Sequence, residues 1–437
     1  MREENGSKAY AELVGRGRVH RRFYTDPEVF AEEQARIFRR VWLWLGHESQ
    51  VRNPGDFFTT RLAGERVIVA RHTDGAIHAF HNRCTHRGAE VCPASSGNAR
   101  NFVCPYHAWT YRTDGSLASV PLEQGYGADF KGRMAGLRLE PVARVASYRG
   151  FIFGSHASAG EDLPTYLGPE VRAAFDNLAD RAPDGEVELA GGRTVQRYRG
   201  NWKLQLENSI DLLHPRILHR SAIDAADRVE HGGQPPSLEW DIVKSNGLTL
   251  REWDGMKIAA MPGGHCWMAG FLTKAIDENA TLDGKTPQAR YRKLMVERYG
   301  EKRATEILAF NRHNTIVYPN LFVNSRVAQI RVLQPVSVDC TEQHGFIFRL
   351  KGAPEEMFED SVRMVNTNNS PSSIVTSDDH EIFERIQKSL TSGRHEWVDL
   401  SRGLHDEGAH SQAAGTNELP MRNQHHAWAQ YMATSSP

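Results

Sequence analysis

The chain is organised around two short segments, Cys84-Thr-His86-Arg-Gly-Ala and Cys104-Pro-Tyr-His107-Ala-Trp. Each segment carries one cysteine and one histidine, spaced Cys-x-His in the first and Cys-x-x-His in the second. Two thiolates and two imidazoles are the ligand set of an asymmetric [2Fe-2S] cluster, in which the cysteines bind one iron and the histidines bind the other. We therefore expect Cys84, His86, Cys104 and His107 to bind such a cluster.

A Cys2His2 zinc site is the alternative use of the same four side chains. Zinc sites usually pair two cysteines in one segment, whereas here each segment holds one cysteine and one histidine. Each segment also continues with small or aromatic residues that can wrap a cluster, Arg-Gly-Ala after His86 and Ala-Trp after His107. The sequence therefore favours the iron–sulfur cluster over zinc.

Length and composition indicate a protein with two globular domains. A chain of 437 residues can form two domains with substantial cores, and 40% hydrophobic and 24% charged residues are ordinary proportions. The net charge of −1, without a block of like charge, gives no reason to expect binding to nucleic acid or to an anionic membrane. No apolar run approaches the ~20 residues of a membrane span, and the polar N-terminus lacks a signal-peptide core, so we expect a cytoplasmic protein.

The pattern of strands and turns divides the chain into three segments. Residues 1–41 end in a helix that starts at Asp26-Pro27, where a capping residue precedes a proline in the first turn. Short β runs separated by turns in residues 42–156 predict a small all-β domain. Residues 157–437 mix strand-like runs, such as Leu248-Thr-Leu-Arg-Glu-Trp, with longer helical patterns. This mixture predicts an α+β domain built around an antiparallel sheet.

The segment Glu207-Asn-Ser-Ile-Asp-Leu-Leu-His-Pro-Arg-Ile-Leu-His219 indicates a second metal site. On a helix, Asp211 and His214 would share one face. Because Pro215 disfavours the helical conformation at His214, we expect His214 and His219 at a helix end and in the following turn, where both imidazoles can converge. Two histidines and one carboxylate form the ligand set of non-haem Fe(II) oxygenases, which leaves positions open for O2. Two histidines this close are also common as plain polar groups, so the upstream cluster is what favours a metal role.

These motifs resemble those of a known family. The two cluster segments are similar to the Rieske domain of ring-hydroxylating oxygenases, and the block from Glu207 to His219 and the pair Asp378-Asp379 are similar to the same family's catalytic domain. The resemblance spans nearly the whole chain and is strongest for the large (alpha) subunits of aromatic-ring-hydroxylating dioxygenases. Within these, the benzoate, anthranilate and salicylate branch is the most similar in three segments, Arg331-Val-Leu-Gln-Pro-Val, Gly300-Glu-Lys-Arg-Ala and Asp399-Leu-Ser-Arg-Gly.

The resemblance implies an all-β Rieske domain ahead of a catalytic domain with an antiparallel sheet flanked by helices, of the helix-grip or START-like type. It also implies that residues 1–41 pack on the catalytic domain, and that the alpha chains form a homotrimer, often with a small beta subunit as α3β3. By the same resemblance, we expect NADH to supply electrons through a reductase, with or without a ferredoxin. We expect these electrons to reach the [2Fe-2S] cluster and then the mononuclear Fe(II) of a neighbouring subunit.

Roles for single residues also follow from the resemblance. The third iron ligand is placed at Asp379, with Asp378 as the alternative, although an acid at a helix start is also a common cap. Asp211 is then not a ligand and bridges a mononuclear-iron histidine and a cluster histidine of the neighbouring subunit; the simpler alternative is that it only orients His214. Asn208 matches a position near the iron.

The same branch implies that the substrate is an aromatic carboxylic acid. A buried carboxylate without a partner is costly, so the pocket needs a cation. Arg331, on a predicted strand, and Arg326 are the candidates, because a guanidinium binds a carboxylate through two hydrogen bonds; a surface arginine in an ordinary salt bridge is the simpler interpretation of either. The remaining pocket is expected to be apolar or aromatic, with these candidates: Leu212, Leu213, Trp267, Phe271, Ile316 and Phe322.

We therefore expect a terminal oxygenase component that converts an aromatic ring to a cis-dihydrodiol. A Rieske monooxygenase that demethylates or hydroxylates once is the alternative, because it shares both metal sites. A Rieske protein dedicated to electron transfer is a more distant alternative. Such proteins carry an extra cysteine in each segment, and Ala89 and Tyr106 stand at those positions.

Overall fold

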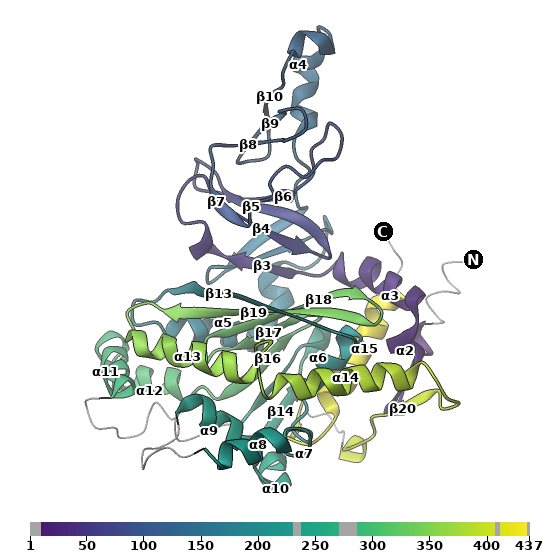
Figure 1. The fold of residues 1–437 in the computed structure, drawn as a ribbon, viewed down its shortest axis with the longest axis vertical. Helices are drawn as coiled ribbons and strands as arrows, with labels where there is room; N and C mark the ends of the chain where they lie inside the picture. The colour runs from purple at the N-terminus through teal and green to yellow at the C-terminus, as the bar shows by residue number, and fades with distance from the viewer. Residues whose placement is uncertain (1–9, 230–236, 271–285, 407–410, 435–437) are drawn as a thin grey trace. The chain divides into compact units, whose positions relative to one another are not determined.

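The computed structural model describes residues 10–229, 237–270, 286–406 and 411–434. The chain forms two compact units: Phe38–Tyr166 is one, and Met1–Ile37 together with Leu167–Pro437 is the other. Each unit has its own sheets and helices (Figure 1). Among the described residues, no helix combines the length and apolarity needed to cross a bilayer.

The smaller unit consists of three antiparallel sheets, in the strand orders β6-β5-β4-β7, β10-β9-β8 and β11-β12-β3. Strand β12 is buried along its whole length, and in β5 the four consecutive residues Val67, Ile68, Val69 and Ala70 are fully inaccessible. The ten strands are β3 (Leu43–His47), β4 (Asp56–Leu62), β5 (Glu65–Arg71), β6 (Ile77–His81), β7 (Ser96–Asn98), β8 (Asn101–Val103), β9 (Thr110–Arg112), β10 (Leu117–Ser119), β11 (Arg144–Tyr148) and β12 (Phe151–Ser155).

The larger unit is built around an eight-stranded antiparallel sheet in the order β13-β19-β18-β17-β16-β15-β14-β21. Its longest strands, β13 and β19, pair from Val187 to Tyr198 with one irregularity between Ala190 and Arg193. The strands are β13 (Val187–Tyr198), β14 (Lys257–Ala260), β15 (Cys266–Ala269), β16 (Arg312–Val317), β17 (Leu321–Asn324), β18 (Gln329–Ser337), β19 (Cys340–Leu350) and β21 (Gln412–Ala414). A separate small sheet joins β1 (Val14–Gly15), β2 (Arg18–His20) and β20 (Trp397–Asp399).

Helices flank this sheet: α13 contacts β19, α14 contacts β13, α6 contacts β18 and α15 contacts β14. The α+β fold with an antiparallel sheet is therefore confirmed. The main helices are α2 (Arg22–Thr25), α3 (Pro27–Glu33), α5 (Leu163–Asp180), α6 (Trp202–Asn208), α7 (Pro215–Leu218), α8 (Arg220–Asp227), α9 (Leu238–Ser245), α10 (Leu250–Asp254), α11 (Pro287–Tyr299), α12 (Glu301–Ala309), α13 (Glu355–Asn368), α14 (Thr376–Leu390) and α15 (Leu419–Ala433).

One predicted strand is wrong. The run Leu248–Trp253 alternates like a strand but forms the start of helix α10. The Thr249 hydroxyl accepts from the Glu252 amide, and the Glu252 carboxylate accepts from the Thr249 amide. This capping box satisfies two free amides of the first turn, and its local hydrogen bonds outweigh the alternating pattern.

A buried ion pair joins the N-terminal segment to the core of the larger unit. Glu33 at the end of α3 is 0% exposed and accepts from Lys203 Nζ at 2.5 Å. The same carboxylate accepts from Trp202 Nε1 at 2.9 Å and from Trp428 Nε1 at 2.7 Å. Burial lowers the pKa of Lys203, and the Glu33 carboxylate opposes that shift. Because these partners come from α6 and α15, Glu33 holds three helices together.

We expect Glu33→Ala to lower the free energy of unfolding of the larger unit by about 3–5 kcal/mol, because it leaves Lys203 buried without its counter-charge. Urea unfolding followed by tryptophan fluorescence measures this. The control is Glu381→Ala, which breaks an ion pair with Arg385 whose side chains are 59% and 70% exposed; it should cost less than about 1 kcal/mol. Equal midpoints for the two variants would show that the buried pair does not anchor these helices.

Candidate metal centres

The two cluster segments form matching turns in the smaller unit. The Gly88 amide donates to the Cys84 carbonyl at 2.9 Å, and the Ala108 amide donates to the Cys104 carbonyl at 3.0 Å. Both donors have left-handed backbone angles, with φ of 76° at Gly88 and 53° at Ala108. Glycine adopts this conformation without strain, whereas alanine requires support from the surrounding structure. The chain thus builds the same tight loop twice, once around each cysteine.

The four predicted cluster ligands have the chemistry that the group needs. Cys84 and Cys104 are 3% and 2% exposed and form no disulfide. The rings of His86 and His107 lie 4.8 Å apart, and their buried Nδ1 atoms have no hydrogen-bond partner among the described residues. Burial, and then the charge of His107, lowers the pKa of His86, which favours the neutral ring that binds metals. Two buried thiols and two unpartnered ring nitrogens suit a [2Fe-2S] cluster.

Tyr111 on β9 is a site residue that the sequence did not indicate. Its hydroxyl lies 3.2 Å from Cys84 Sγ and accepts from the Thr85 amide at 3.2 Å. Burial raises the pKa of Tyr111, so the phenol keeps its proton. The hydroxyl also lies 2.9 Å from Thr85 Oγ1, which donates to the Leu137 carbonyl, so Tyr111 joins both Cys84 and Thr85 to β9.

The second set of predicted ligands converges in the larger unit. His214 Nε2 lies 3.7 Å and His219 Nε2 lies 3.5 Å from the same atom, Asp379 Oδ1. The two rings are 5.4 Å apart and nearly perpendicular. His214 precedes α7, His219 lies between α7 and α8, and Asp379 is in the first turn of α14. This arrangement fits a metal ion bound by two histidines and one carboxylate.

Asp378 and Asn208 surround these three residues. Asp378 Oδ2 lies 3.4 Å from His219 Nδ1, the ring nitrogen on the other side from Asp379. The geometry therefore supports Asp379 as the ligand and Asp378 as the carboxylate that orients His219. Asn208 Nδ2 lies 3.2 Å from His214 Nε2 and donates to Asp379 Oδ1 at 3.1 Å, which places this amide beside the candidate ion.

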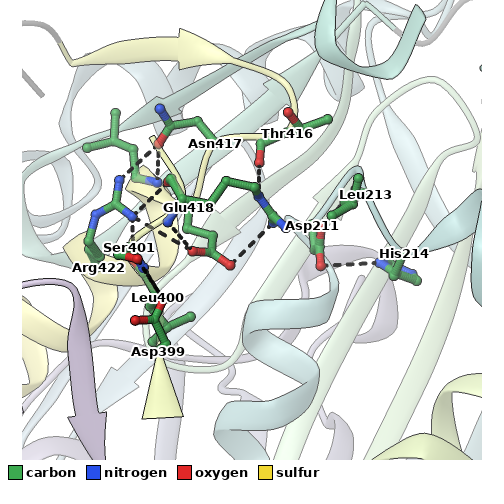
Figure 2. Close-up of polar contacts among 12 residues, drawn as sticks. Asp211, Leu213, His214, Asp399, Leu400, Ser401, Thr416, Asn417, Glu418 and Arg422 are labelled. Carbon is green, nitrogen blue, oxygen red and sulfur yellow. Dashed lines mark hydrogen bonds and ion pairs between the residues drawn. The ribbon is translucent and has the colours of Figure 1, made fainter. Parts of the chain in front are cut away.

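Asp211 lies on the opposite side of His214. Its Oδ2 is 3.9 Å from His214 Nδ1, and its Oδ1 accepts from the Leu213 amide at 2.7 Å (Figure 2). Burial lowers the pKa of His214, while the carboxylates of Asp379 and Asp211 oppose that shift. Asp211 is thus placed to orient His214 from the side away from Asp379.

A cavity of about 110 Å³ opens beside the candidate iron ligands. Three predicted substrate-pocket residues, Arg331, Arg326 and Leu212, line it together with His214 and His219. Of the other apolar candidates, Phe271 lies outside the described residues, and the described lining does not include Leu213, Trp267, Ile316 or Phe322. The lining is more polar than expected and includes these further residues: Asn246, His313, Asn314, Asn324, Gln329, Asn368 and Asn369.

The cavity carries positive charge. Arg331 Nη2 donates to Asn314 Oδ1 at 3.1 Å, and its guanidinium carbon lies 5.1 Å from the centre of the Phe322 ring. Burial lowers the pKa of Arg331 to about 10, with Asp379 opposing, so the guanidinium stays charged at neutral pH. Burial, and then the charges of Arg331 and Arg326, lowers the pKa of His313 to about 3, which keeps this ring neutral.

A further group of possible ligand atoms in the smaller unit has another explanation. Glu65, His81 and His156 bring ligand atoms within 4.8 Å of one another. His81 Nδ1 lies 2.9 Å from Glu65 Oε2, and the Arg39 guanidinium contacts Glu65 Oε1. Because the carboxylate already contacts the Arg39 guanidinium and the His81 ring, we assign these residues to a local polar cluster.

Comparison with known proteins agrees with both centres. A model of the Rieske [2Fe-2S] domain matches residues 41–145, and a model of the ring hydroxylating alpha subunit (catalytic domain) matches residues 183–434. The large subunit of anthranilate 1,2-dioxygenase from Acinetobacter baylyi is 32% identical over 89% of this chain and 80% of its own length. Subunit alpha of toluate 1,2-dioxygenase from Pseudomonas putida is 32% identical over 95% of this chain and 91% of its own length.

The fold of solved structures agrees as well. A naphthalene 1,2-dioxygenase with indole bound in its active site superposes with a TM-score of 0.80, at 25% identity, over 97% of this chain and 94% of that chain. Both domain models, the relatives and the superposition point to one family. The chain therefore belongs to the ring-hydroxylating oxygenases, as an alpha subunit with a Rieske [2Fe-2S] cluster domain and a catalytic domain for mononuclear iron.

Proposed function

We propose that this chain is the catalytic subunit of a terminal oxygenase that cis-dihydroxylates an aromatic carboxylic acid, using O2 and electrons derived from NADH. The observation that carries the proposal is Arg331, a half-buried cation that lines the same cavity as His214 and His219. The names of similar proteins support it, since these include anthranilate, toluate and 2-halobenzoate 1,2-dioxygenases.

Within this proposal, Cys84, His86, Cys104 and His107 bind the cluster in a domain that covers residues 42–156. His214, His219 and Asp379 bind the mononuclear Fe(II) in a domain that covers residues 157–437, on which residues 1–41 pack. When bound, the cluster supplies electrons and the iron supplies the activation of O2. The protein's own task is then to hold the ring in the cavity and to exclude bulk water from it.

The size and charge of the cavity suit a single ring with one carboxylate. The cavity of about 110 Å³ is somewhat smaller than the engineered cavities of about 150 Å³ that hold benzene, so its size favours a single ring over fused rings. The Arg331 guanidinium offers a paired hydrogen-bond donor for the carboxylate, and Arg326 adds positive charge to the lining of the same cavity. Leu212 supplies apolar surface for the ring.

The proposed assembly is a homotrimer, as α3β3 with a small beta subunit, that works in the cytoplasm with a reductase and, in some systems, a ferredoxin. The relatives above are named as large or alpha subunits, which supports a multisubunit enzyme. In this trimer, Asp211 hydrogen-bonds His214 and the partner subunit's His107, and so shortens the path of the electron between the two centres. Asn208 holds the ligands from the other side.

Turnover with 18O2 tests the proposed function. The purified protein would receive a compatible reductase, NADH, Fe(II) and a panel of benzoate, anthranilate, salicylate and phthalate isomers with their neutral analogues. We expect two labelled atoms in the product of an aromatic acid and no product from its neutral analogue. One labelled atom would instead identify a monooxygenase. Turnover of neutral rings alone would overturn the carboxylate assignment.

Arg331→Gln should lower kcat/KM for the acid by about 10–100-fold, because a hydrogen bond to a charged group is worth about 1.5–3 kcal/mol. The loss should fall mainly on KM, since the carboxylate is remote from the reacting carbons. Steady-state kinetics measures it, with Arg290→Gln, an exposed arginine paired with Glu356, as the control. An unchanged KM for the acid would exclude Arg331 as the anchor.

His214→Ala should abolish product formation while the visible spectrum of the cluster stays unchanged, because His214 and the cluster ligands lie in different units. The mononuclear iron content should fall with the activity, as measured by metal analysis after desalting. His395→Ala, at an exposed position, is the control. Bleaching of the cluster in His214→Ala would contradict the assignment of two separate metal sites.

A further inference from the structure

The two oxygens of Asp211 have different partners. Oδ2 faces His214 Nδ1 at 3.9 Å, whereas Oδ1 accepts from the Leu213 amide at 2.7 Å and lies 3.8 Å from Arg402 Nη2. His214 Nδ1 is buried and makes no hydrogen bond to any described residue. The direction in which Asp211 points therefore decides whether this nitrogen has an acceptor.

Arg402 is itself held firmly from the C-terminal segment. Its Nε donates to the Thr416 carbonyl at 2.6 Å, its backbone amide donates to Glu418 Oε2 at 2.9 Å, and its Nη2 lies 3.3 Å from Glu418 Oε1. These contacts fix the backbone amide, Nε and Nη2 of Arg402. The guanidinium that reaches Asp211 is thus a preorganised group and not a freely moving surface charge.

A second, buried arginine fixes the backbone of the same segment (Figure 2). Arg422 on α15 is 4% exposed. Its Nη1 donates to the carbonyls of Leu400 at 2.6 Å and Arg402 at 3.0 Å, and its Nη2 donates to Asn417 Oδ1 at 3.0 Å. The charges then alternate along a line from Asp211 through Arg402 and Glu418 to Arg422.

We propose that Arg402 is a positioning residue that, with the Leu213 amide, holds one oxygen of Asp211 and so keeps the other oxygen directed at His214 Nδ1. An acceptor at Nδ1 keeps the proton of the neutral ring on that nitrogen and leaves Nε2 free on the side of Asp379. Arg402 thus acts on the candidate iron ligand through Asp211. The consequence for electron transfer rests on the bridging role of Asp211 in the proposed function.

A merely structural role in folding the segment 399–418 is the alternative. In that case the loss of Arg402 would affect the site by loosening this segment, and the size of that effect would not depend on the Asp211 carboxylate. A double-mutant cycle between Arg402 and Asp211 distinguishes the two, because residues that act through one another give non-additive effects.

The first experiment measures Co(II) affinity in the full-length protein after a chelator has removed the mononuclear iron and left the cluster, by competition with a fluorescent chelator. Loss of a group that orients a metal-binding histidine typically costs about 10–100-fold in affinity or activity, and we expect this for Asp211→Asn. Arg402→Gln should lower the Co(II) affinity by about 3–10-fold, which is part of the loss expected for Asp211→Asn. In the Asp211→Asn background the Arg402→Gln change should have no further effect.

Arg402→Lys keeps the positive charge but loses the planar guanidinium with its several donors, so it should recover part of the Co(II) affinity. The control variant Arg290→Gln should have the Co(II) affinity of the wild type. Equal losses from Arg402→Gln in both backgrounds, or no loss in either, would overturn the proposal. Because Arg402→Gln also disturbs contacts to Thr416 and Glu418, far-UV circular dichroism and the cluster spectrum establish that each variant is folded.

A second measurement separates this inference from the proposed function. With Fe(II), substrate and O2 present, reoxidation of the chemically reduced cluster is followed in a single turnover. We expect slower reoxidation in both Asp211→Asn and Arg402→Gln, with an unchanged KM for the substrate. Wild-type reoxidation in both variants, together with the coupled Co(II) result, would refute the bridge between subunits and leave the positioning role of Arg402 in place.

Discussion

The convergence of two histidine nitrogens on one carboxylate oxygen is the constraint on which the larger unit depends. His214 and His219 reach Asp379 Oδ1 from the two ends of a single short helix, whereas Asp379 comes from a helix about 160 residues later. Such a site exists only if α6, α7 and α14 keep their relative positions. The packing around these helices therefore positions the metal ligands in addition to stabilising the fold.

Each of these elements is held by polar contacts as well as by apolar packing. Helix α6 is held through Trp202 and Lys203, which both bond the buried carboxylate of Glu33. Asp378 in α14 contacts the outer nitrogen of His219, and Asp211 faces that of His214. Charged groups in a low-dielectric interior are costly when misplaced, so these contacts penalise arrangements in which the histidines turn away.

Sequence reasoning identified what is local and failed where the information is spread over the chain. Both cluster segments and the block from Glu207 to His219 were predicted because their spacing itself brings ligands together. No role was predicted for Tyr111, and Arg402 was noted only within the segment Asp399-Leu-Ser-Arg-Gly. Neither residue type indicates a contact until folding places the side chains beside Cys84 and Asp211. The polar lining of the cavity was missed for the same reason, because it is gathered from separate strands and helices.

The charges around the cavity form one balanced system. Burial, and then the charges of Arg331 and Arg326, lowers the pKa of His313 and keeps its ring neutral, while Asp379, a candidate iron ligand, is the acid that counteracts the effect of burial on the pKa of Arg331. A metal ion bound to Asp379 neutralises part of the carboxylate's negative charge, so Asp379 then stabilises the Arg331 cation less. The cavity should therefore bind an anion more tightly when the metal is bound than when it is absent. Metal binding and carboxylate binding should therefore favour each other through the single carboxylate that both cations share.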